Sequence, residues 1–139
     1  MKVETSIEIA AAPEAVWAVI TDPERLVRGT GITSIKGAPD FGAHIKIQNE
    51  VAPGRTFAVT VSDFTPPKQM VWRAGMPFGL FSGVRTFTIT PTEGGSRLHM
   101  QEVFKGFLEK MITRSMPDLK PSFDKFAAAV KRMSEGESP

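Results

Sequence analysis

The sequence contains no cysteine, no tyrosine and only 2 histidines. Without cysteine the chain forms no disulfide, no thiolate metal site and no cysteine nucleophile. His44 and His99 alternate with apolar neighbours and are expected on wet strand faces, and a metal site usually needs three or four converging ligands. Glycine-rich phosphate loops and the GxSxG nucleophile motif are also missing. We therefore expect no metal and no cofactor.

Long apolar runs are missing as well. No segment approaches the roughly 20 residues that a transmembrane helix needs, and residues 1–5 lack the pattern of a signal peptide. We expect a cytoplasmic protein without a membrane span. The net charge is +2, and the lysines and arginines after position 108 alternate with acidic residues, so no nucleic acid is expected as a partner. The 139 residues suit a single domain over 1–134, with a frayed tail at 135–139.

Most of the first hundred residues alternate between apolar and polar positions, which is the pattern of half-buried antiparallel strands. The expected strands cover 2–10, 32–36, 44–51, 56–64, 68–74, 81–90 and 96–104. Two short helices are expected after the first strand. One opens at Pro13, and the other has Asp22 as its N-cap and Pro23 at its first position.

The last third of the chain changes period. From 108 to 133 the apolar residues recur every three or four positions, which predicts a helical stripe. Pro117 and Pro121 interrupt that stripe, so we expect a break there and an uninterrupted helix from Pro121 to Ser134. The fold class is therefore α+β: a curved antiparallel sheet of six or seven strands wrapped around one long C-terminal helix, with space enclosed between them.

The segment from Pro91 to Gly95 is a hairpin signal. If Pro91 opposes Ser96, then Arg85 opposes Glu102, and both side chains lie on the apolar inner face. Charged residues are seldom buried unless they are paired. The ion pair either orients a polar group of a bound ligand or is a self-contained salt bridge that fixes the register.

The loop from 75 to 81 is apolar for a connection between strands, since loops normally run through water. It either closes over a cavity mouth, contacts a partner or packs against the edge of the core. With the inner strand faces and the helical stripe, it completes the set of side chains expected to line a ligand cavity. These are Trp17, Ile45, Ile47, Phe57, Val59, Phe78, Phe81, Arg85, Phe87, Ile89, Leu98, Met100, Glu102, Met111, Ile112, Met116 and Phe123.

Several segments resemble those of a known family. They are residues 9–17 with Thr21-Asp22-Pro23, residues 83–91, the turn 94–96, and residues 102–108. Together they are similar to the helix-grip fold of the START/Bet v 1-like superfamily, in its bacterial polyketide cyclase/dehydrase-like (SRPBCC) branch. The resemblance covers nearly the whole chain and implies a hydrophobic cavity that binds lipids, polyketides or similar apolar molecules. Some relatives are cyclases that use a cavity arginine, for which Arg85 is the matching position here.

The leading hypothesis is that the protein binds a small hydrophobic ligand of lipid, polyketide or aromatic type between the sheet and the C-terminal helix. One alternative is a polyketide cyclase or dehydratase in which Arg85 stabilises an enolate and Glu102 is the base or orienter. A carboxylate held by an arginine is a poor base, which ranks this second. The other alternative is a protein-interaction module, as in the Hsp90 co-chaperone-like branch. The chain is expected to be a monomer or homodimer.

Overall fold

The computed structural model describes residues 1–136, which form a seven-stranded antiparallel sheet and four helices. The elements in chain order are β1 (Lys2–Ile9), α1 (Pro13–Ile20), α2 (Pro23–Leu26), β2 (Ile32–Lys36), β3 (His44–Asn49), β4 (Phe57–Thr65), β5 (Gln69–Met76), β6 (Phe81–Thr92), β7 (Gly95–Lys105), α3 (Glu109–Arg114) and α4 (Lys120–Ser134). The α+β prediction is confirmed, with seven strands.

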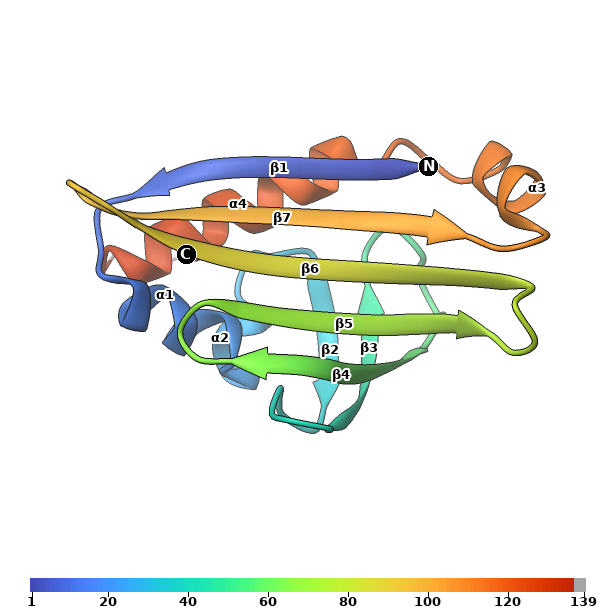
Figure 1. Cartoon of the computed structure of the whole chain (residues 1–139), viewed down its shortest axis with the longest axis horizontal. Coiled ribbons are helices and arrows are strands. Elements are labelled where there is room, and N and C mark those ends of the chain that lie inside the picture. The colour runs from blue at the N-terminus through green and yellow to red at the C-terminus, as the bar shows by residue number, and fades with distance from the viewer. Residues whose placement is uncertain (137–139) are drawn as a thin grey trace.

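The strands are ordered β1-β7-β6-β5-β4-β3-β2, so the first strand pairs with the last. The sheet curls strongly: in Figure 1, β2 and β3 cross behind the other strands at a steep angle. Helix α4 lies behind β1 and β7, and it packs mainly against β1 and α1. The predicted helix-grip arrangement, a curved sheet around a C-terminal helix, is therefore the observed one.

Two prolines and one aspartate define where α1 and α2 begin, as the sequence predicts. Pro13 and Pro23 occupy first turns, where a missing N–H costs nothing. The Asp22 side chain accepts a 3.0 Å hydrogen bond from the Glu24 N–H and caps α2. Near Pro117 the helical stripe breaks completely, because α3 ends at Arg114 and α4 begins at Lys120.

The core lies between the inner face of the sheet and the helices. It is built from aliphatic and aromatic side chains of every strand, with α1, α2 and α4 closing it. Its largest fully buried side chains include Phe87, Phe123, Ile9, Ile20, Leu26, Ile45, Met70, Leu98 and Met100.

A register shift between Val61 and Asp63 breaks the alternation of β4. The alternation in sequence puts Asp63 in phase with Phe57, Val59 and Val61. Because Ser62 is an extra residue, Asp63 instead pairs with Val71 and turns to the outer face. There its carboxylate accepts hydrogen bonds from Gln69 (2.8 Å) and Thr65 (2.9 Å), which hold its pKa below the usual value.

Polar contacts tie both ends of α4 to the N-terminal part of the chain. At its start, Asp124 accepts hydrogen bonds from the Lys120 ammonium (2.6 Å) and from the Thr5 hydroxyl (2.7 Å) of β1. Glu135 is the first residue of the tail expected over 135–139. Its carboxylate accepts hydrogen bonds from the Ala10 N–H (2.7 Å) and the Lys131 ammonium (2.6 Å). Residues 137–139 lie outside the described residues.

Asp124 links stability to pH. The hydrogen bond from Lys120 has the largest effect on the Asp124 carboxyl, and the one from Thr5 comes next. Both lower the pKa of this carboxyl below its ordinary value. A carboxyl with a lowered pKa in the folded state stabilises the protein above its unfolded pKa, and the effect is lost as the pH falls through the folded pKa. We expect Asp124→Asn to have a lower Tm than the wild type at pH 7, and this difference to shrink as the pH is lowered through the acidic range. Equal melting temperatures at pH 7 would contradict this.

Candidate functional site

Five neighbouring strands each contribute one side chain to a row across the inner face of the sheet. Paired positions place the five in direct succession from β4 to β1: Val61, Trp72, Arg85, Glu102 and Val3. The cross-strand pairing of Arg85 with Glu102 is the one that the hairpin register predicts. Two charged groups and an indole N–H thus lie between two aliphatic side chains.

Arg85 and Glu102 form an ion pair that is largely withdrawn from water. The Arg85 Nε–H donates to Glu102 Oε1 over 2.7 Å. The two side chains are only 23% and 16% exposed. The guanidinium carbon lies 4.7 Å from the centre of the Phe123 ring at the start of α4, a distance at which a cation is attracted to an aromatic face. The sheet and α4 therefore hold the arginine from two sides.

Gly83 makes room for the carboxylate. A Cβ at this position would lie 2.7 Å from Glu102 Oε2 and 3.2 Å from the Phe104 ring. Atoms essentially never approach that closely, so a larger residue would displace the carboxylate or the ring. The opposite position on β5 is Ala74, another small residue. Two small residues therefore lie next to the ion pair on β6 and β5.

Trp72 brings an unused hydrogen-bond donor to the same row. Its side chain stands directly opposite Arg85 on β5, and the residue is 4% exposed. Its ring packs edge-on against Phe87, with centroids 4.8 Å apart. The indole Nε1–H is buried and has no hydrogen-bond partner among the described residues. An unpaired buried donor costs free energy, so it is a group that a ligand acceptor would satisfy.

Sequence reasoning missed Trp72 and Gly83 as members of this site. Gly83 could have been found, because the predicted hairpin register already places it on the same face as Arg85. Trp72 could not be placed in the same way. The six-residue segment between the strands predicted over 68–74 and 81–90 carries no turn signal that fixes their pairing.

The other side chains expected to line a cavity fall into three groups. Buried in the core are Ile45, Ile47, Val59, Phe87, Ile89, Leu98, Met100 and Phe123. Partly buried are Trp17, Phe81, Ile112 and Met116. Exposed are Phe57, Phe78 and Met111. Of these residues Phe123 contacts the ion pair directly, whereas Phe78 and Met111 belong to the exposed surface.

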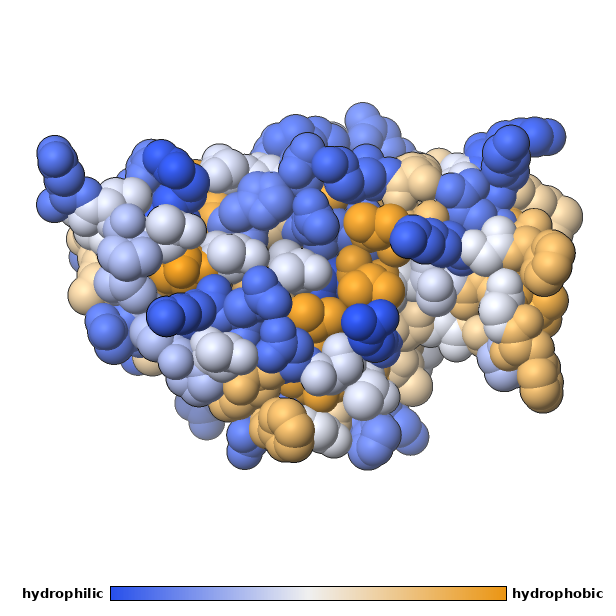
Figure 2. All heavy atoms as spheres, viewed as in Figure 1, coloured by the Kyte–Doolittle hydropathy of each residue, from blue (hydrophilic) through white to orange (hydrophobic). Residues whose placement is uncertain are grey.

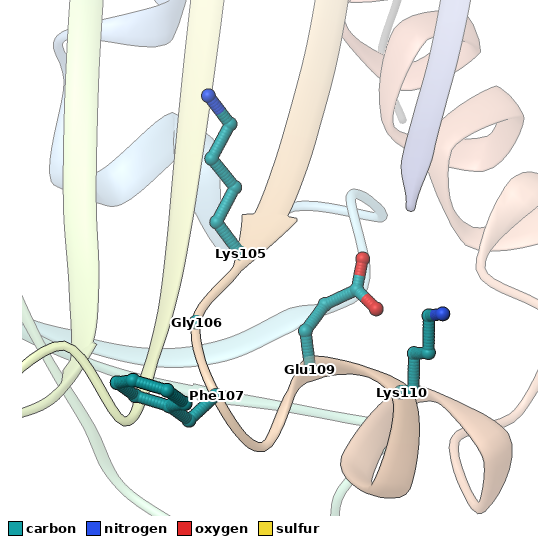
Figure 3. A pocket seen from close by; sticks show the side chains of 5 residues that line it. All are labelled: Lys105, Gly106, Phe107, Glu109 and Lys110. Carbon is teal, nitrogen blue, oxygen red and sulfur yellow. The ribbon is translucent and has the colours of Figure 1, made fainter.

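Two hollows on the surface of the described residues are lined by residues other than Arg85 and Glu102. One, of about 380 Å³, is lined by Lys105, Gly106, Phe107, Glu109 and Lys110 at the end of β7 (Figure 3). The other, of about 480 Å³, is lined by Glu8, Ile9, Ala10, Thr92, Glu93, Gly94, Arg97 and Lys131.

Beneath α4, the aromatic side chains of the sheet and the helix contact each other directly. The ring centres of Phe87 on β6 and Phe126 on α4 are 5.9 Å apart.

Within residues 1–136, no group of three or more histidine, aspartate or glutamate side chains is placed to hold a metal ion. His99 Nε2 instead lies 2.9 Å from Glu4 Oε2 on the outer face, and this hydrogen bond lowers the pKa of the Glu4 carboxyl. No helix in the same range is both long and apolar enough to cross a membrane.

Comparison with known proteins gives one family and one fold. A family model described as "Polyketide cyclase / dehydrase and lipid transport" matches residues 1–135. Protein MLL2253 from Mesorhizobium loti superimposes with a TM-score of 0.75 at 20% identity, over 96% of each chain. DynU16, a putative protein in the dynemicin biosynthetic locus, superimposes with a TM-score of 0.75 at 19% identity, over 99% of this chain and 48% of its own.

The fold extends to more distant sequences. Hypothetical protein jhp0584 from Helicobacter pylori superimposes with a TM-score of 0.78 at 11% identity, over 96% of this chain and 88% of its own. No curated protein matches the sequence significantly.

Proposed function

This chain belongs to the polyketide cyclase/dehydrase and lipid transport family, and on that premise we propose that it binds a small apolar molecule carrying one polar acceptor. The acceptor, such as a carbonyl oxygen, lies at the row of Trp72, Arg85 and Glu102. The apolar remainder of the ligand lies between the sheet and the C-terminal helix.

The observation that carries this proposal is the set of donors left over in a largely buried row. The Trp72 Nε1–H has no partner, and the contact of Arg85 with Glu102 uses the Nε–H. A guanidinium has five N–H donors, so its Nη groups are available beside the indole. Because Glu102 neutralises Arg85, the row favours an uncharged acceptor over a second carboxylate.

Aromatic side chains next to this row suit an apolar ligand body. Phe81 and Phe104 stack with ring centres 5.7 Å apart, just beyond Gly83. Phe123 covers the guanidinium from α4. Phe123 follows the break between α3 and α4 closely in the chain.

Binding is proposed rather than cyclisation because of how Glu102 is held. A cyclase needs a free base near the reacting carbonyl. Glu102 Oε1 is engaged by Arg85, and the described residues bring no histidine or other carboxylate to the row. The pair therefore orients an acceptor and is not arranged to remove a proton.

The test is a ligand screen by thermal shift, followed by calorimetry. The panel pairs aliphatic and aromatic ketones with hydrocarbons of equal size that lack a carbonyl. We expect the ketones to raise the Tm more than the hydrocarbons do. Trp72→Phe and Arg85→Met should each weaken binding of the best ketone by about tenfold or more. If no member of the panel raises the Tm, the proposal is wrong.

The matched control is Arg73→Met. Arg73 stands next to Trp72 on β5 but points to the opposite face, where its Nε–H donates to Ser62 Oγ over 2.8 Å. Arg73→Met makes the same substitution as Arg85→Met, on the neighbouring strand and the opposite face, so ketone binding should be unchanged. Equal loss of binding in Arg73→Met and Arg85→Met would contradict the proposed placement of the acceptor.

A further inference from the structure

One end of the molecule carries a cluster of exposed apolar side chains, called here the apolar tip. Its members are Met76, Phe78, Leu80, Phe107 and Met111. Phe78 is 92% exposed and Phe107 is 89% exposed, although phenylalanine normally lies inside proteins. Figure 2 shows these apolar surfaces gathered at the right-hand end, over the β5–β6 loop and the β7–α3 segment. A cluster of this kind indicates an interaction site.

Backbone hydrogen bonds hold the two segments of the tip together. The Phe107 N–H donates to the Gly79 carbonyl (3.2 Å), and the Leu108 N–H donates to the Leu80 carbonyl (2.8 Å). Gly106 permits this contact, since a Cβ there would lie 2.5 Å from the Leu80 oxygen. The two phenylalanines are therefore presented from one joined surface.

Phe78 adopts a backbone conformation that its ring does not favour. Its φ is 61°, in the left-handed region that bulky residues rarely enter. Such strain persists only where the surrounding structure imposes it, and it is often found at binding sites. Here the imposed conformation places the ring almost wholly in water.

Positive charge borders the tip. Lys105, Lys110 and Arg114 are all exposed, and the first two line the 380 Å³ hollow together with Phe107 (Figure 3). The acidic residue among them, Glu109, points toward the start of β1 and pairs with the N-terminal ammonium group over 2.6 Å. Residues 75–83 contain no charged side chain at all. The tip is therefore apolar at its centre and cationic at its edge.

We propose that the apolar tip docks on a membrane surface that contains anionic phospholipid. Phe78 and Phe107 enter the boundary between headgroups and acyl chains, where aromatic side chains are favoured. Lys105 and Lys110 contact lipid phosphates around the hollow, and basic side chains near an anionic surface strengthen attachment. The projecting shape and the charge complementarity both favour a lipid surface. The proposal does not depend on what the interior of the protein binds.

The experiment is sedimentation of the full chain with vesicles in 0.1 M salt. One set contains phosphatidylcholine with roughly one third phosphatidylglycerol, and the other contains phosphatidylcholine alone. We expect binding to the mixed vesicles, and binding that weakens at high salt. Phe78→Ser/Phe107→Ser should reduce binding by tenfold or more, because each ring loses its apolar burial. Lys105→Glu/Lys110→Glu should reduce it by a similar factor.

Matched controls distinguish binding through the apolar tip from nonspecific adsorption to the vesicles. The β2–β3 loop lies well away from the β5–β6 loop and α3 in Figure 1. Phe41 in this loop is 76% exposed, so Phe41→Ser should bind like the wild type. Lys36→Glu/Lys46→Glu makes the same change of net charge on paired, exposed positions of β2 and β3 and should weaken binding less than the change at 105 and 110. Both controls leave the tip intact.

Three outcomes would overturn the proposal. One is no binding to the mixed vesicles, and another is equal loss in the tip variant and Phe41→Ser. The third concerns a second copy of the chain as the occupant. If the wild type is a dimer that Phe78→Ser/Phe107→Ser converts to a monomer, with no vesicle binding in either, then the tip is a dimer interface. Ligand binding measured at Arg85 in solution is unaffected by any of these results.

Discussion

Phe87→Ala is expected to lower the Tm by roughly 10–20 °C, the largest stability effect of any single change considered. The Phe87 ring is fully buried and contacts both Trp72, at 4.8 Å between ring centres, and Phe126, at 5.9 Å. Truncation leaves a cavity that the rigid sheet and α4 cannot close, which costs about 3–5 kcal/mol. Thermal unfolding followed by circular dichroism measures this loss.

Phe57→Ala is the matched control for Phe87→Ala. Phe57 is the same residue type on another strand of the same sheet, but it is 36% exposed. The alanine there should lower the Tm by much less, because water already reaches part of the ring. Similar losses at both positions would show that the core is not packed around Phe87. Phe87→Ala is also expected to change the environment of Trp72 and hence the tryptophan fluorescence.

Glu102→Ala is expected to lower the free energy of unfolding by about 1–3 kcal/mol. Breaking a fully buried ion pair costs more, but about a sixth to a quarter of each side chain here reaches solvent, which reduces the penalty. The loss arises because Arg85 is left largely buried without its partner. Urea unfolding monitored by circular dichroism measures it.

Two further variants show whether burial is the cause. Arg85→Met/Glu102→Leu replaces the pair by apolar side chains and should recover most of the stability lost in Glu102→Ala. Glu8→Ala breaks the pair with Arg97, which has nearly the same geometry (2.6 Å) but is more than half exposed, and should have little effect. If Glu8→Ala costs as much as Glu102→Ala, burial is not what makes the inner pair matter.

Where the chain carries strong local signals, sequence reasoning was sufficient. The turn between Pro91 and Ser96 fixes the register of β6 and β7 without any other information, and it correctly places Arg85 against Glu102. Asp22 and Pro23 likewise define the start of α2. These features depend on contacts between near neighbours in sequence, or on a single tight turn, and the residues involved have strong conformational preferences.

Features that depend on contacts between residues far apart in the chain could not be predicted from the sequence in the same way. The extra residue at Ser62 turns Asp63 outward, and no turn residue marks it. Trp72 joins the site through the pairing of β5 with β6, and the apolar segment between them fixes no register. The packing of Phe123 on Arg85 depends on the rotamer of each side chain and on where α4 begins. Tertiary packing decides all three.

The pairing of β1 with β7 has a consequence for synthesis of the chain. The ribosome makes Lys2–Ile9 before the other strands of the sheet, yet this strand finds its neighbour only after Gly95–Lys105 has emerged, and α4 must follow to cover it. Loop closure over so many residues is slow, and unpaired edges are prone to aggregate meanwhile. The sheet therefore closes only after β7 has been made, and truncation before α4 leaves β1 uncovered.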